Sequence, residues 1–192
     1  SNNQRNLINC WDNQLISFNN KLDKVRSNQV NNIKNYFNEF LTCFSKNLAD
    51  NISLKFYRGW NKELSYKDYL EEKINEDLFV RYTRYGTHRS DIKITMNNNI
   101  AKDILSRGQK KIVVICLILA QFRFLINNDS TYLHNILLLD DIDSELDINN
   151  LQTLFSILKT FNCQILATTT HERRYDFLDE SEHKMFHVEH IL

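Results

Sequence analysis

The sequence predicts an α/β protein in which strands alternate with helices. Short runs at residues 52–57, 91–96, 135–139 and 163–168 have the length and composition of strands. The segments between them are longer, and their apolar residues recur every three or four positions, as in amphipathic helices. This alternation favours a mostly parallel sheet flanked by helices. A long helical pattern precedes it.

The first half contains one long helical pattern, one strand and one shorter helix. Apolar residues at helical spacing run from residue 15 to residue 48, with a polar interruption at 27–32, so one helix or two helices with a break there fit equally. Residues 52–57 alternate apolar and polar, which predicts a half-buried strand. Ser65 and Asp68 form a capping-box-like pair, and a helix is expected over 65–75.

The second half carries the strands of the expected sheet. Residues 91–96 alternate as a strand and end in an asparagine turn at 97–99. Helices are expected over 107–126 and 149–160. The aliphatic runs at 135–139 and 163–168 predict strands buried on both faces. Residues 185–190 alternate again and are expected to close the sheet.

Composition excludes some classes of function. The chain has no proline and three glycines, Gly59, Gly86 and Gly108, and none of them lies in a Walker A loop or a G-x-G-x-x-G segment. Such loops need glycines because backbone amides wrap closely around phosphates. A self-sufficient nucleotide-binding enzyme of either type is therefore excluded. The zero formal net charge argues against coating nucleic acid by bulk electrostatics.

Cysteine usage and hydropathy indicate an intracellular setting. The four cysteines are far apart, and Cys116 and Cys163 sit in apolar runs, so buried free thiols are expected. There is no signal peptide. The longest apolar stretch, 112–126, contains Gln121 and Arg123 and is shorter than the roughly 20 residues that span a bilayer. A cytoplasmic protein without a membrane segment is expected, and its start without Met is expected of a fragment.

Two segments carry the strongest chemical signals. Residues 136–139 are four aliphatics followed by Asp140 and Asp141, which is a Walker B pattern. At the carboxyl end of a strand the first acid can hold Mg²⁺, and the second can orient or deprotonate water. The simpler interpretation is a buried strand that ends in a polar turn. Residues 105–109, Leu-Ser-Arg-Gly-Gln, begin a helix and can form an anion site, or Ser106 can simply cap that helix.

Two further segments follow in order. Residues 144–147 read Ser-Glu-Leu-Asp, and residues 168–171 end the next strand with Thr-Thr-Thr-His. The order of these four segments is that of the C-terminal lobe of ABC-type ATPases.

On these motifs the chain resembles the C-terminal portion of the RecF family, bacterial DNA replication and repair ATPases of the ABC/SMC-like class. The resemblance covers nearly the whole sequence. The arm pattern Trp11, Asp12, Gln14, Leu15, Leu22 and Arg26 is similar to the family's, and residues 86–91 look like its G-P-H-R-x-D segment. Residues 105–109 match L-S-R-G-Q, residues 138–147 match L-D-D…S-E-L-D, and the tail 184–189 looks like the family's last strand.

The sequence departs from the family pattern at identifiable places. Thr87 stands where proline is usual, and Asn19 stands where glycine is common. The family's N-terminal lobe, with its Walker A loop, has no counterpart in these 192 residues. The resemblance thus implies a helical arm segment at 1–50 and the C-terminal lobe of an ATPase head at 51–192.

The family's mechanism implies roles for particular residues. Two heads dimerise around ATP, so Ser106, Arg107, Gly108 and Gln109 would face nucleotide held by the other head. Asp140 would be the Mg²⁺ ligand and Asp141 the base for water. Ser144, Glu145, Leu146 and Asp147 would lie at the dimer interface. The γ-phosphate would be sensed by Thr169, Thr170 or His171.

The resemblance also implies a biological setting. Members bind gapped or single-stranded/double-stranded junction DNA, work with RecR and RecO, and promote RecA loading; ATP drives head dimerisation and hydrolysis reverses it. This chain would be an ATPase half-site that does not hydrolyse ATP alone. Arg81, Arg84 and Arg89, with Tyr82 and Tyr85 between them, could contact DNA. They could equally form a solvated loop that packs its tyrosines inward, with a structural Arg89–Asp91 ion pair.

Two other hypotheses are open. The chain could be a non-catalytic interaction module, for instance a truncated paralogue that pairs with a complete head. Alternatively, Asp140, Asp141, Asp143 and Asp147 could form a metal-dependent hydrolase site. His183, His187 and His190 alternate near the end of the chain, where solvated histidines are more common than metal ligands.

Overall fold

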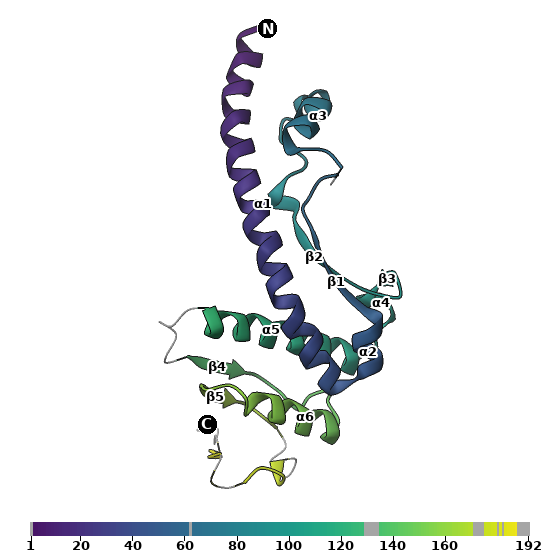
Figure 1. Ribbon diagram of the computed structural model, residues 1–192, viewed down its shortest axis with the longest axis vertical. Coiled ribbons are helices and arrows are strands. Elements are labelled where there is room, and N and C mark those ends of the chain that lie inside the picture. Colours follow the sequence, from purple (N-terminus) through teal and green to yellow (C-terminus); the bar gives the residue numbers. More distant parts are fainter. Residues whose placement is uncertain are drawn as a thin grey trace, which may run out of the picture.

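The computed structural model describes residues 2–61, 63–128, 135–170, 175–179, 181 and 183–187, with side chains described from residue 11 onward. The molecule is elongated (Figure 1), with the helix α1 (Asn2–Phe44) along its long axis. The strands β1 (Ile52–Tyr57) and β2 (Asp91–Met96) run beside α1. The helices that follow residue 100 gather around the C-terminal end of α1, whereas the helix at Tyr66–Val80 lies beside its N-terminal half.

Helix α1 is continuous through the polar segment 27–32, so the single-helix alternative is confirmed. Its C-terminal half buries an apolar stripe that includes Ile33, Phe37 and Leu41, with Phe37 and Leu41 wholly inaccessible. Its N-terminal half leaves Trp11 and Phe18 about two-thirds exposed. The main core therefore lies at one end of the helix. There Ser45 caps the short helix α2 (Lys46–Asn51).

The first sheet is antiparallel. Strand β1 (Ile52–Tyr57) pairs with β2 (Asp91–Met96) so that Lys55 faces Lys93, and β2 pairs with the two-residue strand β3 (Asn99–Ile100). The strands at 52–57 and 91–96 are confirmed, and the turn expected at 97–99 occupies residues 97–98, because Asn99 begins β3. The connection between β1 and β2 holds α3 (Tyr66–Val80), which Ser65 caps and which extends beyond residue 75. A short 3₁₀ turn, η1 (Thr87–Arg89), follows.

Close backbone contact fixes the loop ends beside α3. A Cβ at Gly59 would lie 2.0 Å from the carbonyl oxygen of Gly86, and Gly59 has a φ of 98°. No side chain fits there. Trp60, Tyr66, Tyr69 and Leu70 form a second, smaller core next to this contact.

The second sheet is parallel and carries the acidic motif. Strand β4 (Ile136–Leu139) pairs with β5 (Gln164–Ala167), and the helices α5 (Arg107–Asn128) and α6 (Ile148–Leu158) accompany them in the order expected. The short helix α4 (Ala101–Ile104) precedes α5. The α/β class is thus confirmed, with parallel pairing confined to β4 and β5 among the described residues.

Burial of β4 and β5 on both faces was a wrong prediction. Leu137 packs into the core, whereas Leu138 is 71% exposed and Leu166 is 51% exposed. The core built by α1, α5 and α6 covers only one face of this two-stranded sheet, so an aliphatic residue on the other face stays in solvent.

The strand expected at 185–190 is also not seen where the chain is described. Residues 185–187 have no strand structure, and 188–190 lie outside the described residues. Phe186 is 73% exposed and packs under the Lys184 ammonium group instead of against a sheet. For residues 185–187 the predicted strand is therefore wrong.

Helix α5 is the core helix of the molecule. Within the described residues it alone is long and apolar enough to cross a membrane by length and composition. Its inner face places Cys116, Leu119 and Ala120 in the core without any exposure. Arg123 donates a hydrogen bond to the Thr160 carbonyl just beyond α6. The other face of α5 is open, and Val114, Ile118 and Leu125 are each about half exposed.

Candidate functional site

The ends of β4 and β5 bring two polar residues together. The parallel register pairs Leu139 with Ala167, so Asp140 and Thr168 follow side by side at the carboxyl edge of the sheet. The Thr168 hydroxyl donates to Oδ1 of Asp140 and accepts a hydrogen bond of 2.9 Å from the Asp141 amide. Thr168 therefore fixes both members of the acidic pair, Asp140 and Asp141. From the sequence, Thr168 was placed in the segment 168–171 but given no role toward the acidic pair, although the aligned strand ends were a usable signal.

The acidic pair is exposed and linked to α5. Asp141 has a φ of 48°, a left-handed conformation that turns the chain sharply after the strand. Nζ of Lys111 donates to the Asp141 carbonyl oxygen at 2.6 Å and to Oγ of Ser144 at 3.2 Å. Lys111, one turn into α5, thus ties the start of that helix to the loop after β4. Nothing in the sequence pattern marked it.

The signature segment, residues 105–109, forms a capping box at the start of α5. The Ser106 amide donates to Oε1 of Gln109 at 3.0 Å, and the Gln109 amide donates to Oγ of Ser106 at 3.3 Å. This reciprocal pair satisfies two amide groups that the helix start leaves without partners. Ser106 is therefore a cap, which is compatible with a further role toward an anion.

The signature segment also touches the loop after the acidic pair. A Cβ at Gly108 would lie 3.0 Å from the carbonyl oxygen of Glu145, so this position favours glycine for packing. Glu145 itself has a φ of 63°. The two segments, well separated along the sequence, are therefore in backbone contact at one edge of the molecule.

Within the segment 144–147 the side chains have different environments. Leu146 is 4% exposed and belongs to the core. Asp147 caps α6 by accepting a 2.8 Å hydrogen bond from the Asn150 amide. Ser144 is held by Lys111, which leaves Glu145 as the exposed member whose side chain is not engaged by these contacts.

The threonines after β5 continue the site. Oγ1 of Thr169 donates to Oδ2 of Asp143 at 2.8 Å, and Asp143 is only 2% exposed. Thr170 is exposed at the same edge, and His171 lies outside the described residues. Asp143 and Asp147 therefore serve local structure. Within the described part of the chain no three His, Cys, Asp or Glu side chains form a group able to hold a metal.

The donor set at the acidic pair nevertheless fits Mg²⁺. This ion keeps several waters and is commonly bound by one or two carboxylates together with substrate phosphates. The exposed Asp140 carboxylate, with one oxygen bound by the Thr168 hydroxyl, offers that arrangement. The residues present are thus compatible with Mg²⁺ bound through water and phosphate.

The candidate DNA-binding arginines lie away from this edge, near α3. Arg81 ends α3 in a left-handed conformation with a φ of 64°. The Arg84 guanidinium pairs with Glu76 at 3.1 Å and stacks on Tyr85. Arg89 is exposed in η1, and Asp91 accepts its hydrogen bond from the Ile92 amide. Of these three guanidinium groups, only that of Arg84 is engaged by the described contacts, and Arg81 and Arg89 are both exposed.

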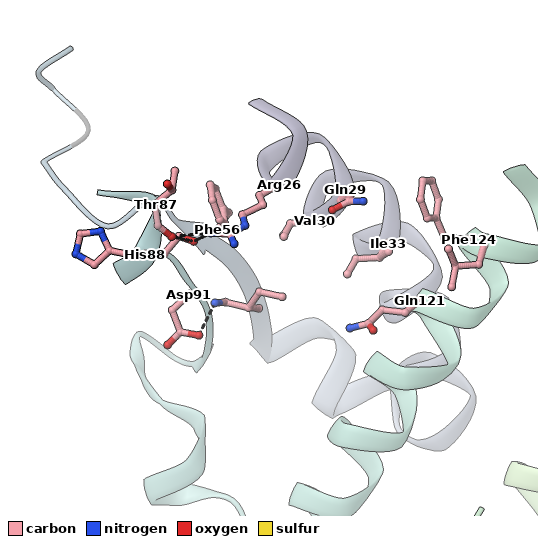
Figure 2. A pocket seen from close by; sticks show the side chains of 13 residues that line it. Arg26, Gln29, Val30, Ile33, Phe56, Thr87, His88, Asp91, Gln121 and Phe124 are labelled. Carbon is pink, nitrogen blue, oxygen red and sulfur yellow. Dashed lines mark hydrogen bonds between the residues drawn. The ribbon is translucent and has the colours of Figure 1, made fainter. Parts of the chain in front are cut away.

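Helix α1 binds the segment 86–91 directly. Oδ1 of Asn19 accepts a 2.9 Å hydrogen bond from the Thr87 amide, and Nη1 of Arg26 donates at 2.6 Å to both the Thr87 carbonyl and Ser90 Oγ. Figure 2 shows Arg26 beside Thr87 and Asp91, at one end of a cavity of about 520 Å³ between α1, the β1–β2 ribbon and α5. Gln121 and Phe124 face it from α5.

A buried phenol lies beside the same segment. The Tyr66 hydroxyl donates to the Tyr85 carbonyl at 3.0 Å. Burial raises the pKa of Tyr66 to about 12, and the nearby Asp77 and Asp12 carboxylates add to the effect.

Comparison with known proteins gives a consistent set of relatives. Residues 82–191 match the family described as the RecF/RecN/SMC N terminal domain. The DNA replication and repair protein RecF of Vibrio cholerae is 35% identical over 184 residues, which covers 95% of this chain and 49% of the relative. RecF of Hydrogenovibrio crunogenus is 30% identical, with coverage of 95% and 50%. The chain spans about half the length of the curated relatives it matches.

Solved structures agree with these relatives. A structure of the recombination mediator protein RecF-ATPrS in the RecFOR pathway matches with a TM-score of 0.68 and 25% identity, over 87% of this chain and 46% of that chain. The RecF-ATP structure matches equally well, at 24% identity. The ATPase-type α/β fold expected from the sequence is therefore confirmed.

Proposed function

The chain belongs to the RecF/RecN/SMC N-terminal domain family, and from that premise we propose that it is the RecF-like half of an ATP-dependent DNA replication and repair protein. One observation carries the proposal. Lys111 joins the start of α5 to the Asp141 carbonyl and to Ser144, which brings the signature segment, the acidic pair and the segment 144–147 to a single edge. An ATPase half-site of this class needs that convergence.

Asp140 would hold Mg²⁺ in this half-site, and Mg²⁺ when bound would neutralise charge on the phosphates of ATP. The Thr168 hydroxyl orients the Asp140 carboxylate, and the Thr168–Asp141 hydrogen bond fixes the turn that presents Asp141. Asp141, exposed at the edge, is the proposed base that takes a proton from the attacking water. Thr169, Thr170 or His171 would sense the γ-phosphate.

The signature segment would act on nucleotide held by a second head. The start of a 22-residue helix carries positive dipole charge that favours an anion. Arg107 and the amides around Gly108 and Gln109 would contact the γ-phosphate from the other side. Glu145 and Ser144, adjacent to that segment, would meet the partner head. ATP would therefore hold an ATP-dependent dimer together.

The biological setting follows from the same premise. The proposed ligands are single-stranded and gapped or junction DNA, contacted in part by Arg81, Arg84 and Arg89. RecR and RecO are the proposed protein partners, RecA loading is the proposed outcome, and the compartment is the cytoplasm.

ATP-dependent pairing with a complete head tests the proposal. The chain is mixed with full-length Vibrio cholerae RecF and Mg²⁺, and the mass is measured by light scattering in ATP and in ADP. A 1:1 complex that forms only in ATP is expected. Ser106→Asp should abolish it, because an acid would face the γ-phosphate.

Asn75→Asp serves as the matched control for that variant. It adds the same charge on α3, which lies at the opposite end of the molecule from α5 (Figure 1). It should pair with the complete head as the parent chain does. Pairing that ignores the nucleotide, or that survives Ser106→Asp, would contradict the proposed function.

A further inference from the structure

A groove of about 610 Å³ lies between helix α1 and the edge of the β1–β2 ribbon, away from the ATPase edge. Its lining includes four cationic side chains, Lys34, Lys55, Arg58 and Lys93, and one acidic side chain, Asp23. The groove thus has a formal charge of +3 in a chain whose net charge is zero. This is the electrostatic footprint of an anion-binding surface.

The Asp23 carboxylate does not balance the lysines. It is 8% exposed and bound by Arg58, with Nη2 of Arg58 at 2.6 Å from Oδ2. Within the described part of the chain, no ion pair joins Lys34, Lys55 or Lys93 to a carboxylate. The ammonium group of Lys93 lies 4.0 Å from the centre of the Tyr57 ring. Three positive charges are therefore left for a ligand.

Two of these lysines form an unfavourable pair in the unliganded protein. Lys55 and Lys93 are direct cross-strand partners in the antiparallel register. Like charges in that position destabilise a sheet, because their side chains start about 5 Å apart. An anion bound between the two ammonium groups would remove this repulsion and stabilise the sheet.

We propose that this groove binds the phosphodiester backbone of a DNA strand without preference for base sequence. The cations come from three separate elements, α1, β1 and β2, which suits an extended polyanion. Base stacking is disfavoured, because Trp60 is 3% exposed and the Tyr57 ring is occupied by Lys93. This inference rests on the proposed function, since it locates a contact for the proposed DNA ligand.

Charge-neutralising variants test the groove. The triple variant Lys34→Gln, Lys55→Gln, Lys93→Gln is compared with Lys24→Gln, Lys46→Gln, Lys67→Gln, which removes the same charge from exposed sites outside the groove. Binding of a fluorescent mixed-sequence single strand is measured against salt concentration. Loss of three phosphate contacts should weaken binding about 100-fold at about 0.1 M salt and lower the slope of log K against log salt by about 2. The control should stay within about threefold.

Measurements of Tm and of ATP binding distinguish a loss of DNA binding from unfolding and from a nucleotide site in the groove. Relief of the Lys55–Lys93 repulsion should leave the Tm of the groove variant equal to or above that of the parent chain, so lost binding is not unfolding. The proposal would be overturned if the two triple variants had equal effects on DNA binding. It would also be overturned if the groove bound ATP more tightly than the DNA strand, or if the chain bound no DNA at low salt. ATP-dependent pairing with a complete head, measured separately, would still stand in these cases.

Discussion

The amide of Thr87 donates a hydrogen bond to Oδ1 of Asn19, across 68 positions of sequence. These are the two places where the chain departs from the RecF-like pattern of proline and glycine. Proline has no amide hydrogen and glycine has no side chain. Each of these two residues thus supplies one partner of the same buried hydrogen bond, and we expect that they compensate each other energetically.

A double-mutant cycle tests this compensation. Asn19→Ala should lower the free energy of unfolding by about 1 kcal/mol, because it leaves the Thr87 amide without its partner. Thr87→Pro is compatible with the first position of η1 and removes that amide. The double variant should therefore lose about 1 kcal/mol less than the sum of the single variants. Urea unfolding measures all four chains, and simple additivity would refute the coupling.

Two substitutions of Ser106 distinguish its role as a helix cap from its proposed role in contacting nucleotide. Ser106→Ala should lower the free energy of unfolding by about 1 kcal/mol, because it removes half of the capping box. Ser106→Asp keeps a capping oxygen and should leave the Tm nearly unchanged, yet it should abolish ATP-dependent pairing. Thermal unfolding and light scattering on the same samples decide the matter. A Ser106→Asp chain that pairs normally would leave Ser106 only its role as a helix cap and would contradict the proposed function.

Removing Arg58 or removing Asp23 from their ion pair should lower the free energy of unfolding by different amounts. Asp23 is buried, whereas the Arg58 side chain is 32% exposed. Arg58→Ala leaves a buried carboxylate without its partner and should cost about 3 kcal/mol, whereas Asp23→Ala should cost about half of that. Arg58→Ala also loses the stacking of the guanidinium on Trp60. Urea unfolding at pH 7 checks the order, and equal losses would contradict it.

The phenol of Tyr66 predicts a loss of stability in alkali. Its pKa is about 12 in the folded protein, against the ordinary phenol value of 10.0 that an unfolded chain would have. The folded state therefore holds the proton more tightly, and the free energy of unfolding falls as pH rises from about 10 toward about 12. Tyr66→Phe should flatten this part of the profile. Urea midpoints across that range give the test, and identical profiles for both chains would contradict it.

Local patterns were enough to predict most elements. Helices α1 and α5 have long apolar stripes, and the alternation of β1 and β2 has the period of a half-buried strand. Helix α4 was missed because four residues are too few to show a helical period. The aliphatic run of β4 could not reveal how many faces of its sheet would be covered, since that depends on elements far away in the sequence.

The sequence motifs predicted which residues form the candidate site, but not the contacts that hold these residues together. The acidic pair and the signature segment were found from their spacing, and the structure places both at one edge. Thr168 and Lys111 hold that edge together, but Thr168 was noted only as the first residue of the segment 168–171 and Lys111 belongs to no motif. Their roles arise from the β4–β5 register and from the packing of α5 against the loop after β4, both of which are tertiary properties.

Because α1 is unbroken, a tilt of this helix would act as a lever between the main core at its C-terminal half and the smaller core that Ile16 contacts. The stretch from the buried Phe37 to the exposed Trp11 is about 39 Å long at about 1.5 Å per residue, and a tilt of about 10° would move its far end by roughly 7 Å. Arg26 and Asn19 attach the segment 86–91 to that lever along its length. A small rearrangement where α1 meets α5 would thereby be magnified into a displacement at the far end of α1.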